Sequence, residues 1–404
     1  METLSSIDQS TLHQYLAHLL LENLEEGNQI AIWRGPRSSQ IQILIDQTGV
    51  VKKVPLNLEE LPAGFIVHPF EDQPDKKAYF LEANNLLTIA LDVPFEEQLD
   101  NLKPVQVQHS VENCNDRIRL SFVPAELGKL YKGNAEDKQT YLELVEKGKA
   151  EIAAGNLMKI VPARTKSMRL DSSFDLVAAL QRLIQAYPNA FINFFHIPGV
   201  GTWIGASPEL LIQTKGNIFQ TMSLAGTQKA QGDNPLKSVA WTQKEIEEQA
   251  LVGRYIVDCF KKIRLREYEE HGPKTVVAGN LLHLRSDFKV DMDATNFPQL
   301  GSVMLELLHP TSAVCGMPRQ EALSFLSTHE AFDRSLFAGF IGPVNIHSET
   351  SIYVNLRAAR LMEKQAILYA GAGVTEDSIP EKEWEETEMK CDIIGRHLNL
   401  TSPL

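Results

Sequence analysis

Residues 369–390 read YAGAGVTEDSIPEKEWEETEMK and carry the strongest local signal in the chain. An apolar run ends in small residues, after which a serine and a proline mark a turn into an acidic helix. On that helix Glu383, Glu386 and Lys390 recur at spacings of three and four, so they share one face. The segment predicts a strand, a glycine turn, and a helix that presents carboxylates beside an ammonium group.

This arrangement has a chemical interpretation and a plain one. Gly371 and Gly373 let a ligand approach bare backbone N–H groups, and carboxylates suit a hard cation such as Mg²⁺. Together they fit a Mg²⁺-bound small molecule that carries a carboxylate. The alternative is an ordinary glycine turn, followed by a surface pair of Glu386 and Lys390 that contributes little stability.

The composition of the chain excludes several classes of protein. The chain has 404 residues, 43% of them hydrophobic, and a formal net charge of −13. The acidic balance argues against nucleic acid or an anionic membrane as partner, and no apolar run approaches transmembrane length. The polar N-terminus lacks the regions of a signal peptide. Four scattered cysteines without C-x-x-C spacing fit a reducing cytoplasm.

Periodicity predicts long helices mixed with strands that form hairpins. Isoleucines alternate over residues 40–46, which is typical of a half-buried strand. Helices are expected over residues 10–24, 134–154 and about 242–266, and a loop-like join over residues 94–117. This mixture predicts an α+β protein with large antiparallel sheets.

Glu248 lies on the inward stripe of the predicted helix 242–266. A buried carboxylate needs a cation or hydrogen-bond donors. The alternatives are a salt bridge with Lys244, four residues earlier, or a side chain that reaches water at the helix end. His283 and His309 are more typical of structural histidines than of catalysts.

Three other residues suggest chemistry. Lys159 lies in an apolar strand, where burial favours a neutral amine that can act as a base. Glu209 follows a tight turn, and a desolvated glutamate can act as a general acid. Arg357 could bind a carboxylate through its planar fork. For each of them a place on the solvent-facing side of a strand is the alternative.

The order of these motifs resembles the chorismate-utilising enzymes, and among them the isochorismate synthases. In chain order the motifs are KIVPAR (159–164), GASPELL (205–211), LAGT (224–227), KEIEEQALV (244–252), HL (283–284), HPTSAVCG (309–316), FDRSLFAGFIG (332–342), LRAAR (356–360), AGAG (370–373) and EWEETEMK (383–390). The resemblance covers roughly residues 134–398, and the combination is far more specific than any single motif.

The resemblance implies one large α+β domain over residues 1–404, in which two antiparallel sheets pack together with helices outside and an active site in a deep cleft. Residues 1–130 would form its variable N-terminal part, and residues 134–398 would carry the catalytic motifs. It also implies a monomeric cytoplasmic enzyme that acts on the small molecule chorismate and has no nucleic-acid or membrane partner.

The resemblance further implies a reaction in which water adds to C2 of chorismate while the C4 hydroxyl leaves. Lys159 would be the base, Glu209 the acid, and Glu248 with Glu386 the ligands of Mg²⁺. Glu245 and Glu383 would lie near the metal shell. The substrate-binding residues would be Gly226, Thr227, Ala313, Arg357, Gly371 and Lys390.

Related reactions remain as alternatives. Salicylate synthases keep the lysine and go on to eliminate pyruvate, but their usual tyrosine is Phe337 here. Anthranilate and aminodeoxychorismate synthases usually read PIAGT or PIKGT where residues 223–227 read SLAGT. A non-catalytic chorismate-binding relative is a further alternative. Gln249 stands where the family often has histidine. The product could feed menaquinone, siderophore or salicylate synthesis.

Overall fold

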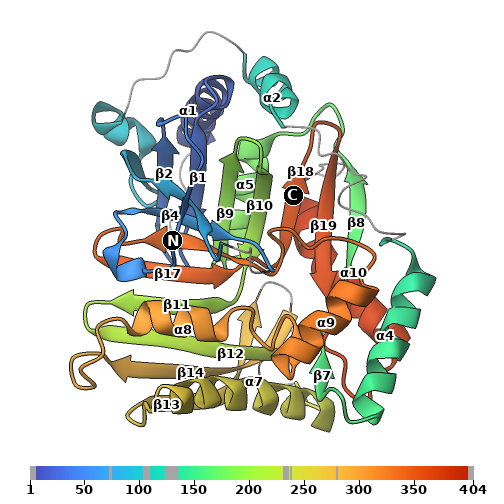
Figure 1. Ribbon diagram of the computed structural model, residues 1–404. Helices are drawn as coiled ribbons and strands as arrows, with labels where there is room; N and C mark the ends of the chain where they lie inside the picture. The colour runs from blue at the N-terminus through green and yellow to red at the C-terminus, as the bar shows by residue number, and fades with distance from the viewer. Residues whose placement is uncertain are drawn as a thin grey trace.

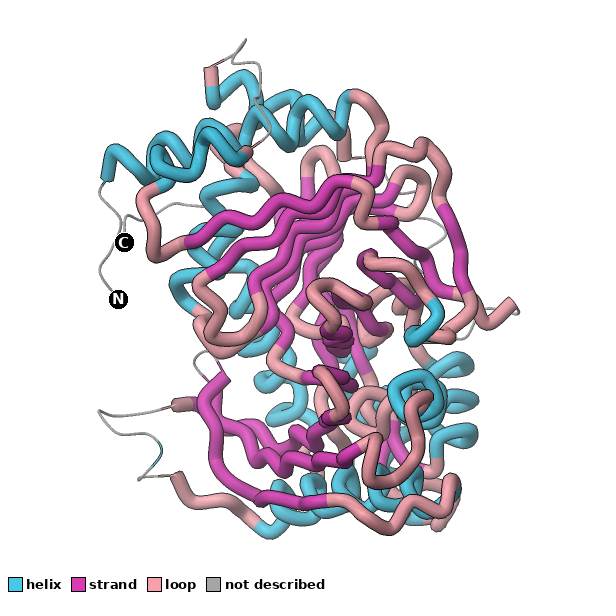
Figure 2. The backbone as a smooth tube through the Cα atoms, turned by 90° about the vertical axis from the view of Figure 1, so that its left-hand side faces the viewer, coloured by secondary structure: helices cyan, strands magenta, loops and turns pink. Residues whose placement is uncertain are grey.

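Two large antiparallel β-sheets pack against each other and form the body of the protein (Figures 1 and 2). This computed structural model describes residues 6–71, 75–102, 110–122, 135–230, 236, 239–278 and 281–398. Helices cover the outer faces of the sheets, so the fold is α+β, as the sequence predicts. Across these ranges, every helix is too short or too polar to cross a membrane.

The first sheet has eight strands and combines the beginning, middle and end of the chain. Its order is β6-β2-β1-β9-β10-β18-β19-β8. The strands are β1 (Gln29–Arg34), β2 (Gln40–Asp46), β6 (Asn85–Ala90), β8 (Ala163–Arg169), β9 (Phe191–Ile197), β10 (Gly201–Ser207), β18 (Ala358–Leu361) and β19 (Gln365–Gly371).

The second sheet has nine strands in the order β13-β14-β12-β11-β17-β16-β4-β5-β3. These are β3 (Lys52–Val54), β4 (Gly64–His68), β5 (Ala78–Glu82), β11 (Leu210–Lys215), β12 (Ile218–Lys229), β13 (Glu269–Ala278), β14 (Leu281–Asp291), β16 (Phe340–Val344) and β17 (Glu349–Val354). A separate short pair joins β7 (Lys159–Ile160) to β15 (Gly316–Met317).

Four of the described helices, α2, α4, α5 and α7, begin at side-chain caps. Asp137 and Asp175 accept backbone N–H bonds at the starts of α4 and α5, and Thr242 with Glu245 forms a capping box on α7. The helices are α1 (Ser6–Glu25), α2 (Val111–Leu120), α4 (Lys138–Ala153), α5 (Leu176–Ala186), α7 (Gln243–Lys262), α8 (Leu300–Leu308), α9 (Arg319–His329) and α10 (Pro380–Leu398), with 3₁₀ turns η1 (Leu58–Glu60) and η2 (Phe95–Asn101).

Strand β9 separates two hydrophobic cores. Its residues alternate between faces, so that Phe191 and Phe195 belong to the core between the sheets. Ile192 and Phe194 point the other way, into a core that α1, α5 and α10 cover. A strand that is apolar on both faces must lie in the middle of a layered structure, and β9 lies between β1 and β10.

Most predicted elements are confirmed, and one is wrong. The alternating stretch forms β2 over residues 40–46, and the helix expected over 242–266 is α7. The join expected over residues 94–117 instead contains η2 and the start of α2. The apolar stripe of α2 is short, because only Cys114 and Ile118 are buried, and Ser110 at its N-cap provides the better signal.

The chain passes from one sheet to the other at two neighbouring points. Strand β10 ends at Ser207 and β11 begins at Leu210, while β17 ends at Val354 and β18 begins at Ala358. Both connections are short, and hydrogen bonds tie them together. The N–H of Ala206 donates to Arg357 at 3.0 Å, and the N–H of Val354 donates to Glu209 at 3.0 Å.

A buried ion pair joins three further segments beside these crossings. Arg334 donates to Glu330 at 2.5 Å and 2.8 Å, and both side chains are almost fully buried. The same guanidinium donates to the carbonyls of Val314 and Val161, and Glu330 accepts the N–H of Ala163. The pair therefore fixes the loop before β15 and the β7–β8 segment relative to each other.

We expect Arg334→Met to lower the free energy of unfolding by about 3–5 kcal/mol, because it leaves the Glu330 carboxylate buried without its cation. Urea unfolding measures the change. The control is Arg396→Met, which removes an equally spaced but exposed pair with Asp392 and should cost less than about 1 kcal/mol. Equal effects of the two substitutions would contradict this role of Arg334.

Candidate active site

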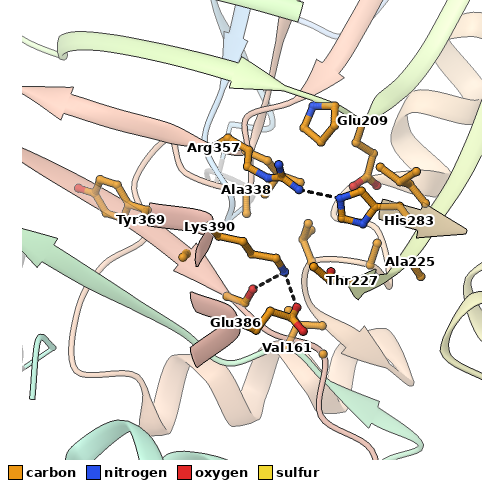
Figure 3. Close-up of a pocket in the computed structure, with 18 of the residues that line it drawn as sticks. Val161, Glu209, Ala225, Thr227, His283, Ala338, Arg357, Tyr369, Glu386 and Lys390 are labelled. Atoms are coloured by element: carbon orange, nitrogen blue, oxygen red, sulfur yellow. Dashed lines mark hydrogen bonds and ion pairs between the residues drawn. The ribbon is translucent and has the colours of Figure 1, made fainter. Parts of the chain in front are cut away.

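A cavity of about 80 Å³ lies next to the two sheet crossings, between the sheets and helices α7 and α10 (Figure 3). Nine of the ten site residues predicted from the sequence line it. They are Glu209, Gly226, Thr227, Glu248, Ala313, Arg357, Gly371, Glu386 and Lys390. The lining combines charged groups with apolar ones, which is typical of a site for a small organic ligand.

Lys159, the tenth predicted residue, lies just behind the lining. It is fully buried on β7, and its Nζ forms an ion pair with Glu248 Oε1 at 2.8 Å. A Cβ atom added to Gly373 would overlap that carboxylate and lie 3.2 Å from Lys159 Cε. Gly373 therefore makes room for this ion pair, where the sequence had suggested room for a ligand.

Glu248 is partnered differently from the expectation based on helix spacing. The predicted alternative partner, Lys244, instead pairs with Glu383 on α10. The second carboxylate oxygen of Glu248 accepts the N–H of Gly226 at 3.3 Å. Gly226 has φ +70° at a bulge in β12, a conformation that glycine adopts without strain.

Glu209 lies at the first crossing between the sheets. Its backbone carbonyl holds Val354, and its side chain faces the cavity with only 4% of the residue exposed. Burial raises the pKa of its carboxyl to about 7, even though the positive charges of Lys159, Lys390 and Arg357 oppose the shift. Glu209 can therefore hold a proton near neutral pH and release it to a ligand.

Arg357 lies at the second crossing and points into the same cavity (Figure 3). Its backbone has φ +50°, and burial lowers the pKa of its guanidinium to about 10. Its Nη2 contacts His283 Nε2 at 2.8 Å, and His283 Nδ1 contacts the carbonyl of Gly226 at 2.6 Å. Since a carbonyl only accepts, Nδ1 carries the proton and Nε2 accepts from Arg357.

His283 is thus a site residue that the sequence interpretation treated as structural. Burial, and then the charge of Arg357, lowers its pKa well below the usual range, so the ring stays neutral. It links Arg357 to the turn at Gly226, and it lines the cavity. The sequence did contain an indication of this role, since His283 lies in the apolar strand β14. A buried histidine needs hydrogen-bond partners for both ring nitrogens.

Lys390 of α10 places a positive charge at the cavity. Its Nζ pairs with Glu386 at 2.7 Å and donates to the carbonyl of Gly371 at 2.8 Å (Figure 3). The Glu386–Lys390 pair predicted from i,i+4 spacing is therefore present, and it lines the cavity. Gly371 contributes a carbonyl that orients the lysine, whereas the sequence had suggested N–H groups for an anion.

Two lining carboxylates are compatible with a magnesium ion. Glu248 and Glu386 come from α7 and α10 and reach the same cavity. Mg²⁺ is commonly held by one or two carboxylates together with a charged ligand and water. Glu383 is held by Lys244, and Glu245 accepts bonds from Gln228 and Thr242. Within the described ranges, no three acidic, histidine or cysteine side chains form a ready cluster for a metal.

Comparisons with known proteins identify the family of this chain. The family model described as chorismate binding enzyme matches residues 63–399. The chain is 31% identical over 272 residues to the isochorismate synthase EntC of Escherichia coli (strain K12), covering 65% of this chain and 68% of that protein. It is 27% identical over 259 residues to the isochorismate synthase MenF of the same organism, covering 63% and 59%.

Solved structures share the fold. DhbC from Bacillus anthracis superposes with a TM-score of 0.70 at 21% identity, covering 95% of this chain and 99% of that one. Anthranilate synthase component I from Streptococcus pneumoniae TIGR4 superposes with a TM-score of 0.63 at 20% identity, covering 91% and 92%.

The raised pKa of Glu209 predicts a pH-dependent difference in stability. Between about pH 4.5 and 7 the folded chain holds a proton that the unfolded chain has lost, so burial of this group costs more stability as the pH rises. Glu209→Gln should therefore gain up to about 3 kcal/mol relative to the parent chain between pH 5 and pH 8. Urea unfolding at several pH values tests this. A difference that does not change with pH would contradict it.

Proposed function

This chain belongs to the chorismate-binding enzyme family, and we propose that it is a Mg²⁺-dependent isochorismate synthase, an isomerase of chorismate. The observation that carries the proposal is the composition of one cavity. A carboxyl that holds its proton near pH 7 shares the cavity with three cationic side chains and two carboxylates. Chorismate offers two carboxylates and a hydroxyl leaving group, so each type of side chain has a matching partner on the substrate.

The proposed reaction moves a hydroxyl group without changing the composition of the substrate. A water oxygen bonds to C2, the ring double bonds shift, and the C4 hydroxyl leaves. The proton of the attacking water passes to the Lys159 amine. A proton from Glu209 allows the C4 oxygen to leave as water. A positioned acid and base of this kind typically contribute 10²–10⁴-fold each to a rate.

Binding and orientation are proposed for the remaining residues. Arg357, held by His283, and Lys390, held by Gly371, are fixed cations for substrate carboxylate oxygens. Gly226, Thr227 and Ala313 shape the wall that faces the ring. Glu248 and Glu386 would hold Mg²⁺, which supplies positive charge for a substrate carboxylate.

In the structure, Lys159 and Glu248 neutralise each other. A cation on Glu248 would take over the role of Lys159 as counter-charge. The ammonium would then release a proton to solvent, and the resulting amine could accept the proton of the attacking water. The proposed base and the proposed metal ligand are therefore linked, because each is the counter-charge of the other. Similar proteins include a menaquinone-specific isochorismate synthase from Escherichia coli and a vibriobactin-specific one from Vibrio cholerae. The product of this chain is proposed to enter menaquinone or siderophore synthesis.

The function is tested by incubating the purified chain with chorismate and Mg²⁺ and separating the products. We expect isochorismate with little salicylate or pyruvate. Pyruvate formed in equal amount to the chorismate consumed would favour a salicylate synthase. Turnover that requires ammonia or a glutaminase would favour an amine-adding synthase. Binding of chorismate without any turnover would indicate a non-catalytic relative.

Lys159→Gln should lower turnover by at least about 10²-fold while chorismate still binds in the presence of Mg²⁺, because the substituted side chain can occupy the space but cannot accept the proton. Rates and calorimetric binding measure the two effects separately. The matched control is Lys166→Gln, which removes a lysine from the neighbouring strand β8 that pairs with Glu388. Near-normal turnover of Lys159→Gln would refute the role of base.

A further inference from the structure

Three glutamates of α7 and α10 lie beside the cavity, and each is paired with a different lysine. The pairs are Lys159–Glu248 at 2.8 Å, Lys390–Glu386 at 2.7 Å and Lys244–Glu383. The first two pairs belong to the proposed reaction and substrate site. The third has no part in that account.

Glu383 is held away from the cavity. It precedes Glu386 by one turn of α10, yet Glu386 lines the cavity and Glu383 does not. Its side chain is only 2% exposed and is directed to Lys244, which precedes Glu248 by one turn of α7. The Lys244–Glu383 pair therefore joins the two helices one turn away from the two carboxylates that line the cavity.

All three carboxylates favour the charged form of Lys244. Burial alone would lower the pKa of this lysine, but the charges of Glu383, Glu386 and Glu248, in decreasing order, raise it above its usual value. The pKa of Glu383 is raised by burial and by the charge of Glu386, and Lys244 opposes that shift. Glu383 thus lies close enough to Glu386 for the two charges to interact, and Lys244 is its counter-ion.

We propose that Lys244 determines the metal selectivity of this site by keeping Glu383 out of the coordination of the bound ion. The inference rests on the proposed Mg²⁺ site at Glu248 and Glu386. With Lys244 present, the protein offers two carboxylates, which suits Mg²⁺, since that ion keeps several waters. Without Lys244, Glu383 becomes a third available carboxylate, which favours Ca²⁺ because Ca²⁺ accepts more oxygen ligands in looser geometry.

The test compares the affinities of the metal-free chain for Mg²⁺ and Ca²⁺ by titration calorimetry. In Lys244→Met we expect Ca²⁺ binding to tighten at least tenfold and Mg²⁺ binding to change less than threefold. Lys244→Met/Glu383→Gln should return the ratio of the two affinities to that of the parent chain. A purely structural role of Lys244 would weaken both ions together, and that result would overturn the proposal, as would unchanged affinities.

Two further variants complete the design. Lys166→Met breaks the ion pair between Lys166 and Glu388. Glu388 is also on α10 but does not line the cavity, so this variant should leave the ratio of the Ca²⁺ and Mg²⁺ affinities unchanged. Lys244→Gln keeps a donor for Glu383 without the charge and replaces the methionine variant if that one does not fold. It should shift the ratio in the same direction by at least threefold, and no shift would overturn the proposal.

The outcomes also separate this inference from the proposed function. A parent chain that makes isochorismate but binds neither ion would overturn the metal site and the role of Lys244 while leaving the reaction. A chain that makes no isochorismate but shows the shift in the ratio would overturn the function and support the role of Lys244.

Discussion

The paired crossing between the two sheets determines where the chemistry of this protein can take place. Glu209 and Arg357 occupy the two short connections, and backbone hydrogen bonds between the connections fix their separation. Each strand pair continues from one sheet into the other, so neither connection can move without disturbing both sheets. The proposed acid and one proposed substrate-binding cation therefore lie on the rigid part of the fold, which is the arrangement that precise sites require.

A second constraint is the balance of buried charge around the cavity. Removing an ion from water is costly unless an opposite charge or donors replace the water. Every carboxylate that is expected to bind metal here already has a lysine partner, and the cation Arg357 has a neutral histidine that holds it in place. These charged groups therefore have partners without a ligand. A ligand would bind by replacing those partners.

The sequence predicted which residues line the cavity better than it predicted the contacts between them. The motifs contain nearly all of the residues that line the cavity. The ion-pair and hydrogen-bond partners of the site residues were harder to predict. Spacing along α7 suggested Lys244 for Glu248, but the lysine pairs with Glu383 on a helix far away in the chain. The role of His283 depends on contacts with Arg357 and Gly226, which the fold alone brings together. Local periodicity has no information about such distant pairs.

The position of the N-terminal strands has a consequence for how the protein is made. Strand β1 pairs with β9, and β4 pairs with β16, so that His68 lies opposite Phe340. During translation, at roughly 5–20 residues per second, β4 would wait some tens of seconds for its partner. Its apolar side chains and one unpaired edge stay exposed during that time. The free edge of β4 therefore has to be kept from pairing wrongly until β16 has been made.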